Sequence, residues 1–121
     1  MSDAKCPDCW KSAVVTSTVD RLQKQLKLLA DRGYGDRDRL FRKMVEEFGE
    51  YAEAIEYYNG STRKKKKLGG LDPVAKLREE VADMLMITLA LAKVEGMDIV
   101  RACDMAASKL EQRTKEHNER K

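Results

Sequence analysis

The sequence contains very little histidine, and this scarcity excludes several kinds of catalytic site. The one histidine, His117, stands near the C-terminus, where we expect a solvated side chain. No Ser-His or Cys-His nucleophile is therefore available. A di-iron carboxylate bundle is also disfavoured, because such bundles take Glu-x-x-His motifs from two helices and no histidine stands near Glu47 or Glu80.

Cysteine is also scarce, and its odd count argues against a disulfide framework. The cysteines are Cys6, Cys9 and Cys103. Cys6 and Cys9 have the CxxC spacing of a zinc knuckle or a redox pair, but a closed zinc site needs about four ligands. Only Cys103 and His117 remain as further candidates, so we favour an incidental or dimer-bridging pair and keep zinc or redox chemistry as the alternative. This cysteine content suits a reducing cytoplasm.

Long apolar runs are absent as well. The longest, residues 84–92, is far too short to span a bilayer, and residues 1–11 lack the apolar centre of a signal peptide. We therefore expect a soluble, cytoplasmic protein with no membrane partner. The 24 basic and 21 acidic side chains nearly cancel, so the charge balance does not demand a nucleic-acid partner.

What remains favours a helical fold. With only two prolines, 42% hydrophobic and 37% charged residues, the chain is typical of a highly charged helical bundle. Apolar spacing and cap residues predict four helices, over residues 12–31, 38–58, 73–95 and 99–117. We expect residues 1–11 to form a flexible arm and residues 12–118 a single all-α domain. Trp10 in the arm is either a buried anchor or a wall on which a nucleobase stacks.

A basic connector, residues 59–72, separates the second and third predicted helices. It contains five consecutive basic residues, residues 63–67. Because a run of like charges does not pack, we expect a solvated and mobile loop. The alternative is a flexible basic lid that attracts an anionic substrate.

Two acidic pairs stand where apolar residues are expected. Glu47 and Glu50 lie on the second predicted helix, and Glu80 and Asp83 repeat the spacing on the third. An i, i+3 pair presents both carboxylates on one helix face, and a carboxylate in a core position is costly unless a cation meets it. Two such pairs directed inward would form an all-oxygen cage of the kind that suits Mg²⁺ or Mn²⁺.

Three basic residues are candidates for phosphate binding. Lys76 lies one turn before the second acidic pair, and Lys109 and Arg113 continue the apolar seam of the last predicted helix. Basic groups at these positions could hold phosphates against a metal. For Lys109 and Arg113, the alternative is an interaction with the helix macrodipole.

These motifs resemble those of MazG-like nucleotide pyrophosphohydrolases. Residues 46–50 (EEFGE) and 80–83 (EVAD) are similar to the family signature EExxE…ExxD, and residues 43–55 are similar to its KLxEExGELxEA helix. Lys109 and Arg113 match a late K-x-x-x-R pair. The resemblance covers roughly residues 40–113.

The resemblance implies an all-α four-helix bundle that is completed by oligomerisation, as a homodimer or a homotetramer. It also implies Mg²⁺-dependent hydrolysis of a nucleoside triphosphate, with a monophosphate and pyrophosphate as products. The residues that match the family's metal ligands are Glu47, Glu50, Glu80 and Asp83, and those that match phosphate contacts are Lys109 and Arg113. Glu46 or Glu53 could accept the proton of the attacking water, and Lys76 could stabilise the leaving group.

A function of another class is a non-catalytic helical module. Such a module would interact with nucleotides or nucleic acid through the basic residues 63–67 and regulate a partner. The two intact acidic pairs argue against this alternative, because a non-catalytic protein gains little from buried, unpaired charges.

Overall fold

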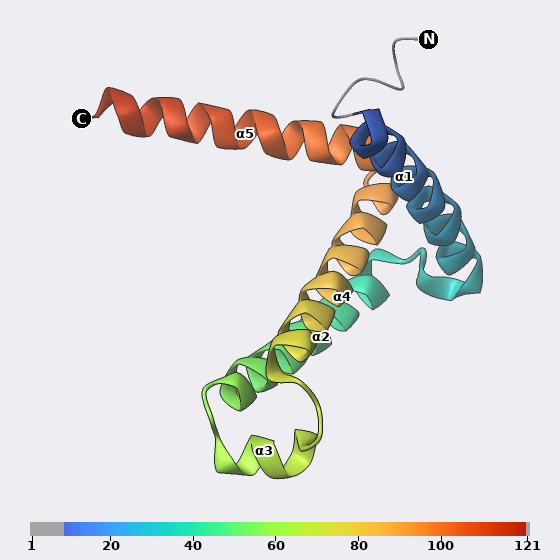
Figure 1. The fold of residues 1–121 in the computed structure, drawn as a ribbon. Coiled ribbons are helices and arrows are strands. Elements are labelled where there is room, and N and C mark those ends of the chain that lie inside the picture. The colour runs from blue at the N-terminus through green and yellow to red at the C-terminus, as the bar shows by residue number, and fades with distance from the viewer. Residues whose placement is uncertain (1–8, 121) are drawn as a thin grey trace.

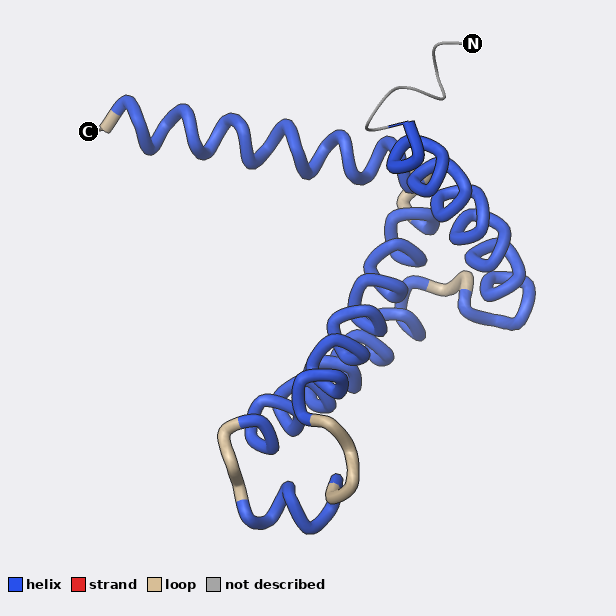
Figure 2. The backbone as a smooth tube through the Cα atoms, viewed as in Figure 1, coloured by secondary structure: helices blue, strands red, loops and turns tan. Residues whose placement is uncertain are grey.

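The computed structural model describes residues 9–120, and their regular secondary structure is entirely helical (Figures 1 and 2). The elements are α1 (Cys9–Leu29), a π-helical turn η2 (Ala30–Tyr34), α2 (Arg37–Tyr58), α3 (Thr62–Leu68), α4 (Pro73–Val94) and α5 (Ile99–Glu119). The predicted all-α fold class is confirmed. The second, third and fourth predicted helices correspond to α2, α4 and α5.

The centre of the fold is a long antiparallel hairpin of α2 and α4 (Figure 1). The buried positions of α2 are Leu40, Glu47, Ala54 and Tyr57, which recur at helical spacing along one face. α4 starts where Asp72 accepts a hydrogen bond from the backbone N–H of Val74 at 3.1 Å. This side-chain cap and the proline at the first helical position fix the start of α4.

The apolar core lies at one end of this hairpin. It is formed where the second half of α1, the start of α2, the second half of α4 and the start of α5 meet, by Leu26, Leu40, Ile87, Leu89, Ala90 and Ile99. The core side of α1 begins with the partly buried Val19, and residues 11–18 are exposed. Val15 shares the helical spacing of Val19 and Leu22 but is exposed, because the first half of α1 extends past the elements on which it would pack.

Helix α5 extends away from the hairpin (Figure 1). Ile99 is buried and Ala102 is half-buried, but every residue from Cys103 to Arg120 is exposed. One chain on its own therefore does not close a four-helix bundle. Completion of the bundle by oligomerisation stays a prediction.

The connector between α2 and α4 differs from the predicted loop over residues 59–72. Thr62–Leu68 form helix α3, and the hydroxyl of Ser61 accepts a hydrogen bond from the N–H of Lys64 at 3.4 Å. The carboxylate Oε1 of Glu53 on α2 lies 3.3 Å from Lys64 Nζ and 2.7 Å from Lys67 Nζ. The connector is therefore exposed, as predicted, at Arg63, Lys65 and Lys67, but residues 62–68 form a helix rather than a loop, because a carboxylate from another helix offsets the repulsion between the lysines.

Two predictions on the N-terminal arm concern groups that the structure does not describe. Cys6, with the CxxC proposal, lies outside the described residues, and so does the side chain of Trp10. Helix α1 begins at Cys9, inside the arm expected over residues 1–11.

We predict that Glu53→Gln loosens α3. Loss of the charge that holds Lys64 and Lys67 should increase the rate of tryptic cleavage within residues 63–67 by about threefold to tenfold, because cleavage requires local opening. The rate can be measured by mass spectrometry of timed digests. Glu56→Gln is the matched control, since Glu56 lies further from Lys64, at 3.8 Å. Equal cleavage rates in both variants would contradict this role for Glu53.

Candidate metal centre

Four carboxylates converge at the middle of the hairpin. They are Glu47 and Glu50 from α2 and Glu80 and Asp83 from α4, and one oxygen of each lies within 4.8 Å of the others. Glu47 and Glu80 are 4% and 1% exposed, while Glu50 and Asp83 are partly buried. The i, i+3 spacing on each helix and the antiparallel pairing of the helices bring these groups together.

The two buried glutamates each keep one oxygen without a partner. Glu47 Oε2 and Glu80 Oε2 are inaccessible and have no hydrogen-bond partner among the described residues. A buried carboxylate oxygen without a donor or a cation destabilises the fold. A hard divalent cation would satisfy both atoms, and its preferred ligands are oxygens of this type. The cluster therefore has the donors and the unmet charge of a metal site.

A lysine contacts the other oxygen of each buried glutamate. Lys76 Nζ lies 2.7 Å from Glu80 Oε1, and Lys43 Nζ lies 3.4 Å from Glu47 Oε1. Because α2 and α4 are antiparallel and each lysine precedes its glutamate by one turn, the two lysines stand at opposite ends of the cluster. The two lysines offset part of its negative charge.

Lys43 was not singled out by the sequence analysis, although the sequence holds a signal for it. Residues 43–50 (KMVEEFGE) and 76–83 (KLREEVAD) both read K-x-x-E-E-x-x-acid. The lysine of the second segment, Lys76, is a predicted phosphate-binding residue because it lies one turn before the acids. The repeated pattern assigns Lys43 to the same place on α2.

Burial, together with the crowding of the acids, raises the pKa values of the two outer carboxyls, Glu50 and Asp83. Burial, followed by the charges and hydrogen bonds of Glu47 and Glu80, raises the pKa of Glu50 to about 7 from an ordinary 4.5. Burial and the same two charges also raise the pKa of Asp83. Each outer carboxyl thus holds a proton more strongly than in water, which is expected where negative charges share a site that lacks a cation.

The two candidate bases lie in different surroundings. Glu46 is exposed beside the cluster, with Lys43 Nζ 3.5 Å from its Oε2. Glu53 lies one turn beyond Glu50, outside the group of converging oxygens, and hydrogen bonds from Lys67 and Lys64 lower its pKa. A carboxylate held in this way is the weaker proton acceptor.

The structure does not bring Lys109 and Arg113 to the acids of their own chain. Both are exposed on α5, which runs away from the hairpin (Figure 1). Sequence spacing gave their position along a helix but could not give the direction of that helix. The phosphate-binding role proposed for them needs the acid cluster of another subunit.

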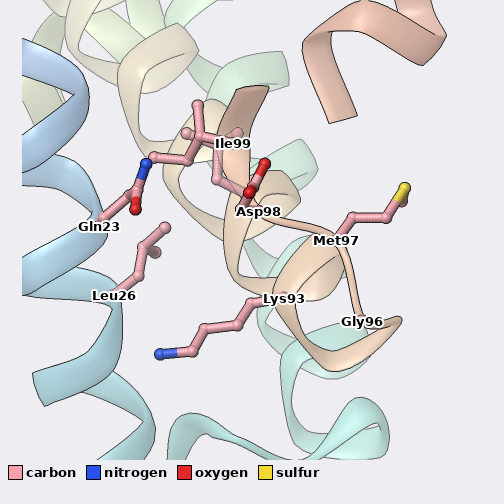
Figure 3. Close-up of a pocket in the computed structure, with 8 residues that line it drawn as sticks. Gln23, Leu26, Lys93, Gly96, Met97, Asp98 and Ile99 are labelled. Carbon is pink, nitrogen blue, oxygen red and sulfur yellow. The ribbon is translucent and has the colours of Figure 1, made fainter. Parts of the chain in front are cut away.

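A cavity beside the apolar core is drawn in Figure 3, and none of the four acids lines it. It has a volume of about 290 Å³ and is lined by residues of α1, the end of α4 and the start of α5, among them Leu26, Leu89 and Ile99. Lys93 on its wall is about 15 Å along α4 from Asp83, at a rise of about 1.5 Å per residue. Asp98 on its wall is engaged in capping α5, where it accepts the N–H of Arg101 at 2.8 Å. This cavity therefore offers no chemistry to the acid cluster.

Comparison with known proteins gives one result that covers most of the chain. A family model described as the MazG nucleotide pyrophosphohydrolase domain matches residues 36–117. The matched segment contains the acid cluster, Lys43 and Lys76, and the resemblance noted in the sequence is confirmed. Comparisons with curated proteins and with solved structures find no match. None of the described helices is both long enough and apolar enough to cross a membrane.

We predict that a divalent cation stabilises the protein and that the gain increases with pH. In the metal-free protein the raised pKa of Glu50, which faces Glu47, Glu80 and Lys76, means that the folded state binds a proton more tightly than the unfolded chain. Its stability should therefore fall as the pH rises from 4.5 to about 7. At a pH above that range, Mg²⁺ at about 100 times its dissociation constant should raise the melting temperature by roughly 10 °C.

The measurement is a series of thermal melts at stepped pH, with and without Mg²⁺ at constant ionic strength. Glu80→Gln is the control variant and should lose most of the increase that Mg²⁺ produces. A wild-type melting temperature that does not respond to Mg²⁺ at any pH would contradict the assignment of a metal centre.

Proposed function

Since this chain belongs to the MazG nucleotide pyrophosphohydrolase family, we propose that it hydrolyses nucleoside triphosphates to monophosphates and pyrophosphate in the cytoplasm, with Mg²⁺ as its cofactor. The observation that carries the proposal is the convergence of four carboxylates within 4.8 Å, with two buried oxygens that have no partner among the described residues. A non-catalytic module would gain nothing from this arrangement.

The residues that would hold Mg²⁺ are Glu47, Glu50, Glu80 and Asp83, and Mn²⁺ is a plausible substitute because it prefers the same ligands. When bound, the ion would supply positive charge between the carboxylates and the phosphates and would lower the pKa of a water molecule. The chain supplies the arrangement of groups around that position. The four acids without a cation would repel a triphosphate.

We assign the role of general base to Glu46 rather than to Glu53. Glu46 borders the acid cluster and also lines an open cavity of about 220 Å³, together with Tyr34, Arg39, Arg42 and Lys43. Water can therefore reach its carboxylate. Glu53 is engaged by two lysines of α3, which leaves its carboxylate less able to accept a proton.

The leaving pyrophosphate belongs at the other end of the cluster. Attack on phosphorus proceeds with the entering and the leaving oxygens roughly in line. If water enters beside Glu46, the leaving group departs toward Lys76, which stands at the opposite end. The ammonium of Lys76 can then stabilise the charge that develops on the leaving group.

We also propose that the active protein is a homodimer or a homotetramer. Phe41, Val45 and Phe48 on α2 are 64%, 54% and 58% exposed, and Val81 and Leu85 on α4 are 49% and 55% exposed. Each of these residues comes directly after a residue whose side chain faces the other helix of the hairpin. In an antiparallel pair of helices, the residues that follow such interface residues lie on the same side of the pair. These five residues therefore form one stripe. We call it the apolar stripe, and a second copy of the chain is the partner we propose for it.

The apolar stripe and the acids point in different directions. Phe48 and Glu50 are two positions apart, which is about 200° around the helix. A second copy on the stripe therefore leaves the acid face open to substrate.

The projecting α5 could contact another subunit, and we propose that Lys109 and Arg113 bind phosphates at the acid cluster of that subunit.

We predict that the protein releases pyrophosphate and a matching monophosphate, and no orthophosphate, from canonical NTPs or dNTPs with Mg²⁺. Glu47→Gln and Asp83→Asn should each lower kcat by about 10²-fold or more while circular dichroism stays unchanged. Asp20→Asn, which removes an exposed carboxylate from α1, is the matched control and should leave the rate unaltered. Orthophosphate as the first product, or full activity in both site variants, would contradict the proposal.

We predict that Phe48→Glu dissociates the oligomer, because a carboxylate would then be buried in an apolar interface. Sedimentation velocity over a range of protein concentrations should show wild-type dimers or tetramers and monomers of the variant. Val14→Glu changes an equally exposed apolar residue on α1 (52% against 58% for Phe48) and should leave the assembly intact. The stripe is not the interface if the wild type is monomeric or if only Val14→Glu dissociates it.

A further inference from the structure

We infer that Lys67 of helix α3 binds the terminal phosphates of the substrate. Lys64 holds α3 in position, and Glu53 forms an ion pair with Lys67 until the phosphates bind. This inference rests on the function proposed above. It assigns the basic run of residues 63–67 a role in phosphate binding.

The position of Glu53 brings the lysines of α3 to the acid face. Glu53 follows Glu50 by one turn on the same side of α2, a distance of about 5 Å along the helix. Its Oε1 lies 2.7 Å from Lys67 Nζ and 3.3 Å from Lys64 Nζ. Two ammonium groups are therefore held about one turn beyond the acid cluster.

Lys76 stands at the same level of the hairpin. Glu50 and Glu80 lie against each other across the two helices, and one further turn of antiparallel pairing places Lys76 opposite Ala54, the neighbour of Glu53. Lys64, Lys67 and Lys76 thus gather at one end of the cluster. This is the end toward which the pyrophosphate leaves when water enters beside Glu46.

The two lysines of α3 differ in how firmly they are held. The side chain of Lys64 is 13% exposed and lies near both Glu53 and Glu56, whereas the side chain of Lys67 is 59% exposed and, among the described residues, pairs with Glu53 alone. Lys67 can therefore turn to a new partner at little cost, since an exposed ion pair contributes about 1 kcal/mol or less. Lys64 keeps α3 in place while this happens.

A terminal phosphate is the stronger partner for Lys67. A pyrophosphate group carries more than one negative charge and offers several acceptor oxygens, whereas Glu53 offers one charge that is shared between two lysines. Both contacts are charge-assisted hydrogen bonds, so the larger negative charge of the phosphate group favours it over Glu53. Binding of substrate would thus exchange one anion for another at the same ammonium group, and Glu53 acts as an internal competitor.

The test is direct binding of inorganic pyrophosphate in the presence of Mg²⁺, measured by titration calorimetry on the full chain. Lys67→Ala should weaken binding by about tenfold, as expected for loss of one charge-assisted contact. Lys65→Ala is the matched control, because it removes an exposed charge from the same helix, and should change the affinity by less than about twofold. Glu53→Gln should tighten binding, by about threefold, because the competitor is lost while Glu56 still pairs with Lys64 and keeps the loosened α3 near the cluster.

Product inhibition of the hydrolysis reaction provides a second measurement. In Lys67→Ala the inhibition constant of pyrophosphate should rise while that of the monophosphate stays unchanged. Equal pyrophosphate affinities in Lys67→Ala and Lys65→Ala, or weaker binding in Glu53→Gln, would overturn the inference even if the wild type hydrolyses triphosphates. If the wild type hydrolyses none of them but the order of pyrophosphate affinities holds, the subsite stands and the proposed reaction falls.

Discussion

The structure depends on one electrostatic constraint, which is that four carboxylates share a small volume in the middle of a helical hairpin. Two of them, Glu47 and Glu80, are almost fully buried. Lys43 and Lys76 each neutralise one oxygen of these glutamates, and the remaining oxygens have no partner in the described part of the chain. Such a cluster opposes folding unless a cation occupies it. The same unmet negative charge would give the cluster affinity for a divalent metal ion.

The two helices of the hairpin carry the same pattern, K-x-x-E-E-x-x-acid, but the surroundings of the two lysines differ. Lys43 borders an open cavity that it shares with Glu46. Lys76 lies toward the end of the hairpin that α3 covers, where Tyr57 also donates a hydrogen bond to the carbonyl oxygen of Leu71 at 2.5 Å. The nearly symmetric carboxylate cluster thus has one open end and one end with additional cations. In the proposed function, that asymmetry would give a bound phosphate chain a direction.

The features that depend on local spacing could be predicted from the sequence. The acids at i, i+3 and the caps at Asp72 and Asp98 are short-range signals, so the limits of α2, α4 and α5 and the convergence of the carboxylates could be anticipated. Prediction from the sequence failed where distant residues decide the outcome. Helix α3 forms because Glu53, on another helix, offsets the charge of its lysines. The direction of α5 depends on packing around Ile99, which no periodicity encodes.

On α2, the surface proposed for association and the carboxylates proposed for catalysis lie on separate faces. The wide apolar arc of this helix serves two contacts, since Leu40 and Ala54 face α4 while Phe41 and Phe48 remain exposed. A helix in a closed monomeric bundle would bury both rows. Because the exposed row lies about 200° from Glu50, burying it against a second copy adds apolar contact without covering the acids. A second copy bound to the exposed row would therefore leave the opposite, acidic side of the hairpin open to a nucleotide.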